Sequence, residues 1–276
     1  MMKRRSSFAR ITLLSRNLLL PLMIFAAVCP VAKGQQPPNK RKAMATSYFN
    51  RGVEKQLKGD IPGAISDYNL ALVFDKQLAI AFHNRGAARH VRGELGEAFL
   101  DMSRAIELNP KYVTAYFNRG NMRKERGDLD GALQDYSSAI DSDPRFVSAY
   151  LNRGIARRDM GDLTGARKDY EAAITLDPKM TLAYVNRGSL KIDTGDIDGG
   201  LSDEEVALKL DPGQATAYYN RACGFYKKGK LAAALADLEK AIALKPTYRI
   251  AAASRDLVVH ILHKTSTASA ELSSGK

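Results

Sequence analysis

The chain has 276 residues, no Trp and a hydrophobic content of 45%, which is typical of a globular protein. Its formal net charge of +12 would favour a nucleic-acid partner, but residues 1–34 hold six basic and no acidic residues, so the remainder carries only +6. A body this mildly basic gives little support to nucleic-acid binding.

Residues 1–34 have the pattern of a secretory signal peptide. Basic residues precede an apolar run from Leu18 to Val28, and the small residues Ala32 and Gly34 suit cleavage before Gln35. The sequence therefore predicts a periplasmic or secreted protein. The alternative is an uncleaved anchor, although the apolar run is about fifteen residues long, shorter than the roughly twenty of a spanning helix. Contact with a membrane is expected only if this segment is retained.

Two further segments have the composition of unfolded chain. Residues 35–44 combine prolines with charged residues, so we expect a flexible linker. Residues 265–276 are rich in Ser, Thr and Ala, and we expect a disordered tail.

Of the two cysteines, Cys29 lies in the expected signal peptide and Cys223 stands alone, so we expect Cys223 to be a small buried residue and not part of a disulfide.

The motif Asn-Arg-Gly returns every 34 residues through the body of the chain. It occurs five times in full and a sixth time as Asn220-Arg221-Ala222. A fixed period of this length indicates a stacked array of helical repeats, in which each unit buries its apolar face against its neighbours.

Other residue types recur in the same register. An aromatic residue stands two positions before each Asn, and a glycine, two small residues and a proline follow in most units, as in Tyr116, Gly127, Ala132, Ala139 and Pro144. These positions match the tetratricopeptide repeat, which the chain resembles over roughly residues 45–248. The resemblance implies an all-α fold, an α-α superhelix (solenoid) of six helix-turn-helix repeats with a C-terminal capping helix at 249–264. The six repeats are expected at residues 45–78, 79–112, 113–146, 147–180, 181–214 and 215–248.

Within one repeat, turn and cap residues predict where the helices begin and end. In the third repeat, Gly127 supplies a left-handed stop for the first helix and Asp128 is placed to cap the second. Asp143-Pro144 ends the unit, because proline cannot continue the helical hydrogen bonds. The fifth repeat departs from the others with Gly199-Gly200 and with Glu204 in an apolar column, so a hinge is expected there.

The Asn column is the candidate binding site, because Asn is a poor helix former in mid-helix. In the tetratricopeptide fold this position looks into the concave groove, similar to the asparagine ladder of O-linked N-acetylglucosamine transferases, whose amides bond the backbone of an extended peptide. The resemblance implies a non-enzymatic scaffold or adaptor that binds an extended peptide segment of another protein. The alternative is that each Asn bonds a neighbouring helix and fixes the superhelical twist. The column consists of Asn50, Asn84, Asn118, Asn152, Asn186 and Asn220.

Each Asn is followed by an Arg, and an Asp stands sixteen residues after that Arg in all six repeats, as in Arg119 and Asp135. We expect an ion pair between helices, because a packed guanidinium needs a partner; a ligand-facing Arg is the alternative. A second basic column lies four residues after the first, on the same helix face. Any of its charges that reaches the groove favours an acidic partner. This second column consists of Lys55, Arg89, Arg123, Arg157 and Lys191.

Two columns beside the Asn column predict a partly apolar groove that admits side chains between the amides. The residues directly before each Asn are Phe49, His83, Phe117, Leu151, Val185 and Tyr219. The residues three positions after each Asn are Val53, Ala87, Asn121, Ile155, Ser189 and Cys223. The set of Lys, Asn and Arg residues that forms a chaperone-type carboxylate clamp is absent from these positions.

The sequence shows no pattern of a catalytic or metal site. His83 and His90, and likewise His260 and His263, share a helix face, but neither pair has an obvious Cys or carboxylate to complete a metal site. No phosphate loop, nucleophile elbow or dinucleotide fingerprint occurs. We therefore expect no enzyme activity, cofactor, metal, small-molecule substrate or nucleic-acid partner. The alternative function is a membrane-tethered assembly factor that interacts through its convex surface, with a purely structural Asn column.

Overall fold

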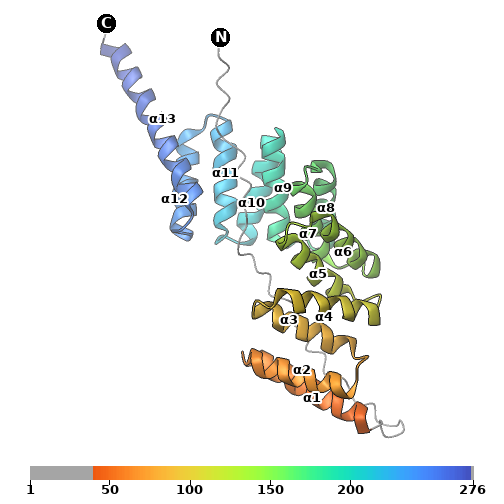
Figure 1. Cartoon of the computed structure of the whole chain (residues 1–276). Coiled ribbons are helices and arrows are strands. Elements are labelled where there is room, and N and C mark those ends of the chain that lie inside the picture. The colour runs from red at the N-terminus through yellow and green to blue at the C-terminus, as the bar shows by residue number, and fades with distance from the viewer. Residues whose placement is uncertain (1–39, 275–276) are drawn as a thin grey trace. The chain divides into compact units, whose positions relative to one another are not determined.

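The computed structural model describes residues 40–274, so the expected signal peptide and the first residues of the expected linker lie outside it. The described residues form thirteen α-helices and no β-strand, which confirms the predicted all-α fold (Figure 1). The chain divides into two compact units, Met1–Ala149 and Tyr150–Lys276.

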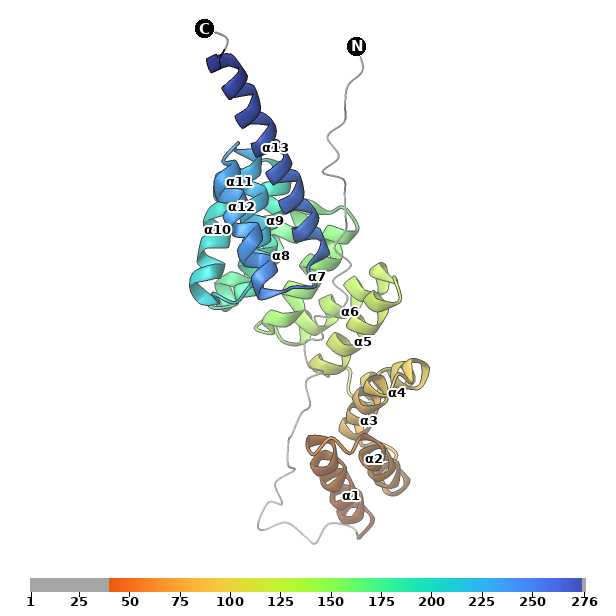
Figure 2. The same ribbon diagram turned by 90° about the vertical axis from the view of Figure 1, so that its left-hand side faces the viewer.

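The helices of the first unit come in pairs joined by short turns, and each pair packs on the next along the chain (Figure 2). They are α1 (Lys40–Leu57), α2 (Ile61–Phe74), α3 (Ala79–Val91), α4 (Leu95–Leu108), α5 (Val113–Glu125) and α6 (Leu129–Ser142). The chain continues with α7 (Val147–Asp159), most of which belongs to the second unit, and then with α8 (Leu163–Leu176), α9 (Thr181–Thr194), α10 (Ile197–Leu210), α11 (Ala215–Lys227), α12 (Leu231–Leu244) and α13 (Arg249–Ser274).

The turn inside each pair is built from a glycine and, in four pairs, an Asp cap. Gly127 ends α5 with a φ of 81°, a left-handed conformation that side chains other than glycine rarely adopt. Asp128 then accepts a hydrogen bond from the backbone N–H of Gly131 at 2.9 Å, where the dipole of α6 favours negative charge. The predicted stop and cap of this repeat are confirmed.

Close contact between the two helices of a pair depends on small residues. Ala132 and Ala139 of α6 are fully buried, and Gly120 of α5 lies against the ring of Tyr136. A Cβ atom on Gly120 would stand 2.8 Å from the ring atom Cε1, closer than packed atoms allow. In the sixth repeat Ala222 replaces this glycine, and Leu238 replaces the tyrosine, so the smaller partner side chain leaves room for the methyl group.

The structure differs from the sequence expectations at both ends of the array. Helix α1 begins at Lys40, inside the expected linker 35–44, because residues 40–45 contain good helix formers and no proline. Helix α13 continues through the expected tail to Ser274 and extends past α12 in Figures 1 and 2. No Gly or Pro interrupts residues 249–274.

Within residues 40–274, no helix combines the length and the apolar character that a membrane crossing requires.

The glycine pair of the fifth repeat has a packing role. Gly199 lies in the first turn of α10, where its N–H donates to the capping carboxylate of Asp196 at 3.0 Å. A Cβ on Gly200 would stand 2.7 Å from the carbonyl oxygen of Gly188 in α9, so this glycine lets the two helices approach closely. The hinge predicted from these glycines therefore loses its basis.

Candidate functional site

The Arg and Asp columns form an ion pair in every repeat, as predicted. In the third repeat, Nε and Nη2 of Arg119 donate to both carboxylate oxygens of Asp135, at 2.9 and 2.7 Å. Asp135 is 1% exposed, so a charge there requires this compensation. The other five pairs have the same two-pronged geometry: Arg51–Asp67, Arg85–Asp101, Arg153–Asp169, Arg187–Asp203 and Arg221–Asp237.

The second basic column binds the same buried carboxylates. In the third repeat Nη1 of Arg123 lies 3.0 Å from Oδ2 of Asp135 and also donates to the carbonyl oxygen of Gly131. The column repeats this ion pair in Lys55–Asp67, Arg89–Asp101, Arg157–Asp169 and Lys191–Asp203. These cations are thus held by the packing between helices, and the expectation that they recruit an acidic partner loses its basis.

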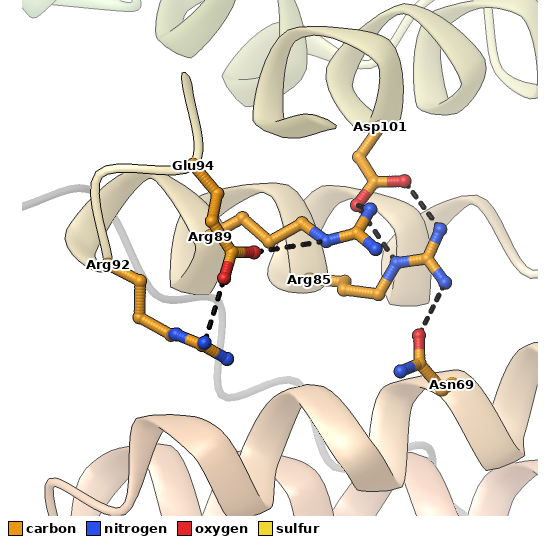
Figure 3. A network of polar contacts seen from close by, with 6 residues as sticks. All are labelled: Asn69, Arg85, Arg89, Arg92, Glu94 and Asp101. Carbon is orange, nitrogen blue, oxygen red and sulfur yellow. Dashed lines mark hydrogen bonds and ion pairs between the residues drawn. The ribbon is translucent and has the colours of Figure 1, made fainter. Parts of the chain in front are cut away.

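The Arg column also links consecutive repeats. Figure 3 shows the second repeat, where Nη1 of Arg85 donates to Oδ1 of Asn69 in α2 at 2.7 Å. Nη1 of Arg119 donates in the same way to Ser103 of α4 at 3.1 Å. Arg51 lies in the first repeat of the described residues, and its side chain is 52% exposed against 15% for Arg85. Arg85 and Arg119 therefore each tie their own helix pair to the pair before it.

The Asn column is mostly enclosed. Asn84 and Asn118 are each 1% exposed, and Asn152 and Asn220 are also buried. Asn50 and Asn186 are half-buried. We call the side of each first helix that carries this column the ladder face.

In the first unit, His83 joins two of these amides. Its Nδ1 lies 3.0 Å from Oδ1 of Asn84, and its Nε2 lies 3.0 Å from Nδ2 of Asn118. An amide oxygen only accepts and an amide nitrogen only donates, so the neutral ring carries its proton on Nδ1. Burial lowers the pKa of His83 to about 4, against the hydrogen bond with Asn84, which raises it. The ring is therefore neutral at physiological pH.

One polar atom of the Asn118 amide has no hydrogen-bond partner: its Oδ1 is buried and accepts no hydrogen bond. Nδ2 of Asn84 makes no hydrogen bond of regular geometry either, but the Asn84 amide lies beside the hydroxyl group of Tyr68. Burial raises the pKa of that hydroxyl, and a hydrogen bond from Asn84 opposes the rise. Asn118 therefore retains an unpaired acceptor, whereas Tyr68 is the partner of the Asn84 donor.

In the second unit the column bonds the protein itself. Nδ2 of Asn220 donates to Oε1 of Glu204 at 2.9 Å and lies 3.4 Å from the carbonyl oxygen of Val185. Nδ2 of Asn186 donates to the carbonyl of Leu182, one turn earlier in its own helix. Asn118 and Asn220 therefore make the contacts to neighbouring helices that the structural alternative predicts.

The two columns beside the amides are buried to different degrees. Phe49, His83, Phe117, Leu151 and Val185 are all 4% exposed or less, whereas Tyr219 is half-buried. Phe117 packs edge-on against Phe146 with ring centroids 5.2 Å apart, so these five side chains belong to the core and do not line a groove. In the column three residues after each Asn, Val53 and Ala87 are buried and the other four are half-buried: Asn121, Ile155, Ser189 and Cys223.

The exposed apolar residues of the ladder face were missed by the sequence reasoning. Leu57 and Val91 are 63% and 60% exposed. They follow Asn50 and Asn84 by seven residues, two helical turns, and so lie on the same side of α1 and α3. The seven-residue spacing from the Asn column was the signal that could have found them.

Metal and thiol chemistry have little support in residues 40–274. No group of three or more His, Cys, Asp or Glu side chains is placed there to hold a metal ion. Nε2 of His90 lies 3.0 Å from Oε2 of Glu125. Burial raises the pKa of the Cys223 thiol to about 11, so it remains protonated.

Comparisons with known proteins agree with this architecture. Family models described as tetratricopeptide or TPR repeats match residues 102–134, 120–157, 147–180 and 215–248. No curated protein sequence matches the chain. The solved structure of YrrB, described as a TPR protein with an unusual peptide-binding site, is 24% identical. The match covers 68% of this chain and 97% of YrrB, with a TM-score of 0.57.

Two other solved structures are similar. PilF of Pseudomonas aeruginosa is 15% identical, and the match covers 76% of this chain and 95% of PilF with a TM-score of 0.67. MamA is 24% identical, with 59% of this chain and 96% of MamA covered and a TM-score of 0.55. At such identities the structures support the fold alone, whereas the matched repeats identify the family. The chain is a tetratricopeptide repeat protein.

Proposed function

We propose that this protein binds an extended segment of another protein along the ladder face of its first helices. The tetratricopeptide repeat fold is that of a protein-interaction scaffold, and YrrB, one of the similar structures, is described as having a peptide-binding site. The family is generally non-catalytic, and we propose that this chain likewise binds without catalysis.

The observation that carries the proposal is the unpaired Oδ1 of Asn118. A buried acceptor without a partner costs about 1–3 kcal/mol, and a bound peptide would remove this cost. A peptide unit has an N–H that can donate to Oδ1 of Asn118. Because this atom is enclosed, binding requires a local opening of the ladder face.

Site-specific photo-crosslinking in the native cell tests where a partner binds. A crosslinking residue at Leu57 lies on the ladder face, and one at Leu100, which is 68% exposed on α4, lies on a second helix. We expect Leu57 to capture a discrete partner protein and Leu100 to capture none. Capture from Leu100 alone would contradict the proposal and favour the alternative, a tethered assembly factor that uses its convex surface.

The captured segment, made as a synthetic peptide, then tests the amides. A net hydrogen bond is worth about 0.5–1.5 kcal/mol, so Asn118→Ala should weaken its Kd by roughly 2- to 12-fold. Gln134→Ala is the matched control, because it removes an exposed amide from α6, a second helix. Equal affinity of the Asn118→Ala variant and the wild type, with unchanged helicity, would reject recognition by the Asn column.

We also propose that the protein acts in the periplasm or outside the cell. This rests on the signal-peptide pattern of residues 1–34, which lie outside the described range. Sequencing of the mature N-terminus tests it: a start at Gln35 supports export with cleavage, and retention of residues 1–34 supports the anchored alternative.

A further inference from the structure

Glu204 occupies a position that is apolar or aromatic in every other repeat. The corresponding residues are Tyr68, Met102, Tyr136, Tyr170 and Leu238. Glu204 is nevertheless 0% exposed, as fully buried as the Tyr68 that it replaces in the first repeat. A carboxyl group at such a site has lost all contact with water, which strongly disfavours its charged form.

The surroundings of Glu204 satisfy only half of the carboxyl group. Oε1 accepts the hydrogen bond from Nδ2 of Asn220 in α11 at 2.9 Å, whereas Oε2 is buried without a partner. The backbone of α9 presses on the same group, because a Cβ on Gly188 would stand 2.7 Å from Oε1. Glu204 is therefore enclosed between α9 and α11.

The charged neighbours of Glu204 do not outweigh its burial: Arg158 and Arg221 favour a negative charge on Glu204, but burial disfavours it more strongly. Asp203, the adjacent carboxylate on α10, repels one, and the cations nearest to Asp203 are bound to it: Arg187 at 2.7 Å and Lys191 at 2.9 Å. The other groups that face Glu204 are Arg158 of α7, Arg221 and Cys223 of α11, and Tyr248 just before α13. Arg158 is 2.6 Å from Asp193, and Arg221 is 2.7 Å from Asp237. Each nearby cation is thus paired with an Asp.

We propose that Glu204 is a protonation switch that closes the packing of α10 against α9 and α11 when it is neutral and opens it when it ionises. The switch acts on Asn220 directly, because the neutral carboxyl group supplies the acceptor that holds that amide. If the Asn column binds a peptide, as proposed above, the switch regulates the part of the column at Asn220. This last consequence rests on the proposed function, whereas the switch itself does not.

The direction of the pH effect follows from where the proton is held. Burial raises the pKa of Glu204 well above its ordinary value of 4.5, so the closed packing keeps the proton. In the open form the carboxyl group meets water and ionises above pH 4.5. Opening therefore releases a proton, and its equilibrium constant rises about tenfold per pH unit until the closed form itself ionises.

Hydrogen exchange of the full chain from pH 5 to pH 8, corrected for intrinsic exchange rates, measures this opening. We expect exchange in α10 and α11 of the wild type to accelerate about tenfold per pH unit over part of this range. The Glu204→Gln variant cannot ionise and should show no such acceleration. Glu205→Gln is the matched control, since it makes the same change at the exposed next residue, and should behave as the wild type.

A second variant and a direct probe cover the case in which Glu204→Gln fails to fold. Glu204→Tyr restores the side chain that Gly52 and Gly154 accommodate in other repeats and should also remove the pH dependence. A carboxyl carbon NMR titration reports the protonation of Glu204 itself. A titration near pH 4.5, or identical exchange profiles for the wild type and both variants, would overturn the switch.

Peptide affinity separates this switch from the proposed function. If the captured peptide binds and Asn220→Ala weakens its binding, the Kd of the peptide should depend on pH in the wild type. This pH dependence should disappear in the Glu204→Gln variant. If no peptide depends on the Asn column but exchange still follows Glu204, the proposed function fails and the switch stands. If binding depends on the column but the exchange profile is flat, the switch fails and the proposed function stands.

Discussion

Arg255 donates two hydrogen bonds to the carboxylate of Asp256, its immediate neighbour in α13, at 3.0 and 2.6 Å. Arg255 is in phase with the Arg column, but no second helix follows α13 within the described residues to supply the usual Asp. Asp256 stands where the repeats have Gly or Ala, and its side chain would block the close approach of a second helix. The pair thus neutralises the unmatched Arg and marks the end of the stacked repeats.

The other end of the array is also polar. Ser47 and Glu54 of α1 are exposed, whereas the corresponding Ala81 and Ala88 of α3 are fully buried against the preceding pair. Within residues 40–274 no helix precedes α1, and polar residues on the outer face of such a terminal repeat keep that face soluble. Helices α1 and α13 therefore differ from the internal helices at the positions that pack against a further repeat elsewhere in the array.

Removal of one buried carboxylate should be costly. Asp135→Asn leaves Arg119 and Arg123 without their shared anion inside the packing, and we expect a loss of about 2–4 kcal/mol in the free energy of unfolding. Urea denaturation followed by circular dichroism measures it. Asp130→Asn, at an exposed site in the first turn of α6, should cost less than about 1 kcal/mol. Equal losses in the two variants would show that the buried pair does not stabilise the repeat.

The close contact of Gly120 with Tyr136 predicts a compensating pair of substitutions. Gly120→Ala should destabilise the protein by about 1–3 kcal/mol, because its Cβ meets the tyrosine ring. Tyr136→Leu in the same chain should recover part of this loss, since the sixth repeat combines Ala222 with Leu238. A double-mutant cycle of unfolding free energies gives the coupling, and additive effects would argue against the steric explanation.

His83 should make the protein sensitive to acid. Its pKa is lowered from 6.5 to about 4 by burial, so the unfolded chain takes up a proton on this ring below pH 6.5 while the folded chain does not. Stability is therefore lost as the pH falls from 6.5 towards 4, by at most about 3 kcal/mol.

The variant His83→Phe tests this assignment, because the first and third repeats have Phe at the same position. This variant should be less stable than the wild type at pH 7, since Asn84 and Asn118 lose their shared partner. Its stability should fall less than that of the wild type when the pH is lowered from 6.5 to 4. Thermal unfolding between pH 4 and pH 7 measures both effects. The control variant His260→Phe, at an exposed site, should lose stability in acid as the wild type does. If His83→Phe loses as much stability in acid as the wild type, His83 is not the cause of the acid sensitivity.

The helix caps offer a comparison between repeats. Asp128 accepts a hydrogen bond from Gly131, whereas Glu94 at the same position in the second repeat caps nothing with its side chain. Asp128→Ala should therefore cost about 1 kcal/mol, and Glu94→Ala only a few tenths. Denaturation midpoints of the two variants decide it, and a larger cost for Glu94→Ala would contradict the cap assignment.

The sequence alone predicted the features that depend on short stretches of chain or on the balance of charge. The period of 34 residues, the left-handed Gly127 and the cap at Asp128 follow from local backbone preferences. The pairing of Arg119 with Asp135 follows because a packed guanidinium must be neutralised, and the Asp column supplies an anion in every repeat.

The partners of the amides and the burial of particular side chains were decided by the tertiary structure. Whether Asn118 faces a ligand or His83 depends on the rotation of one helix pair against the next, which no local preference specifies. The same packing encloses Glu204 with one oxygen unpaired and leaves Leu57 exposed. A repeat pattern determines which residues share a helix face, but the angle and distance between neighbouring helices determine what that face meets.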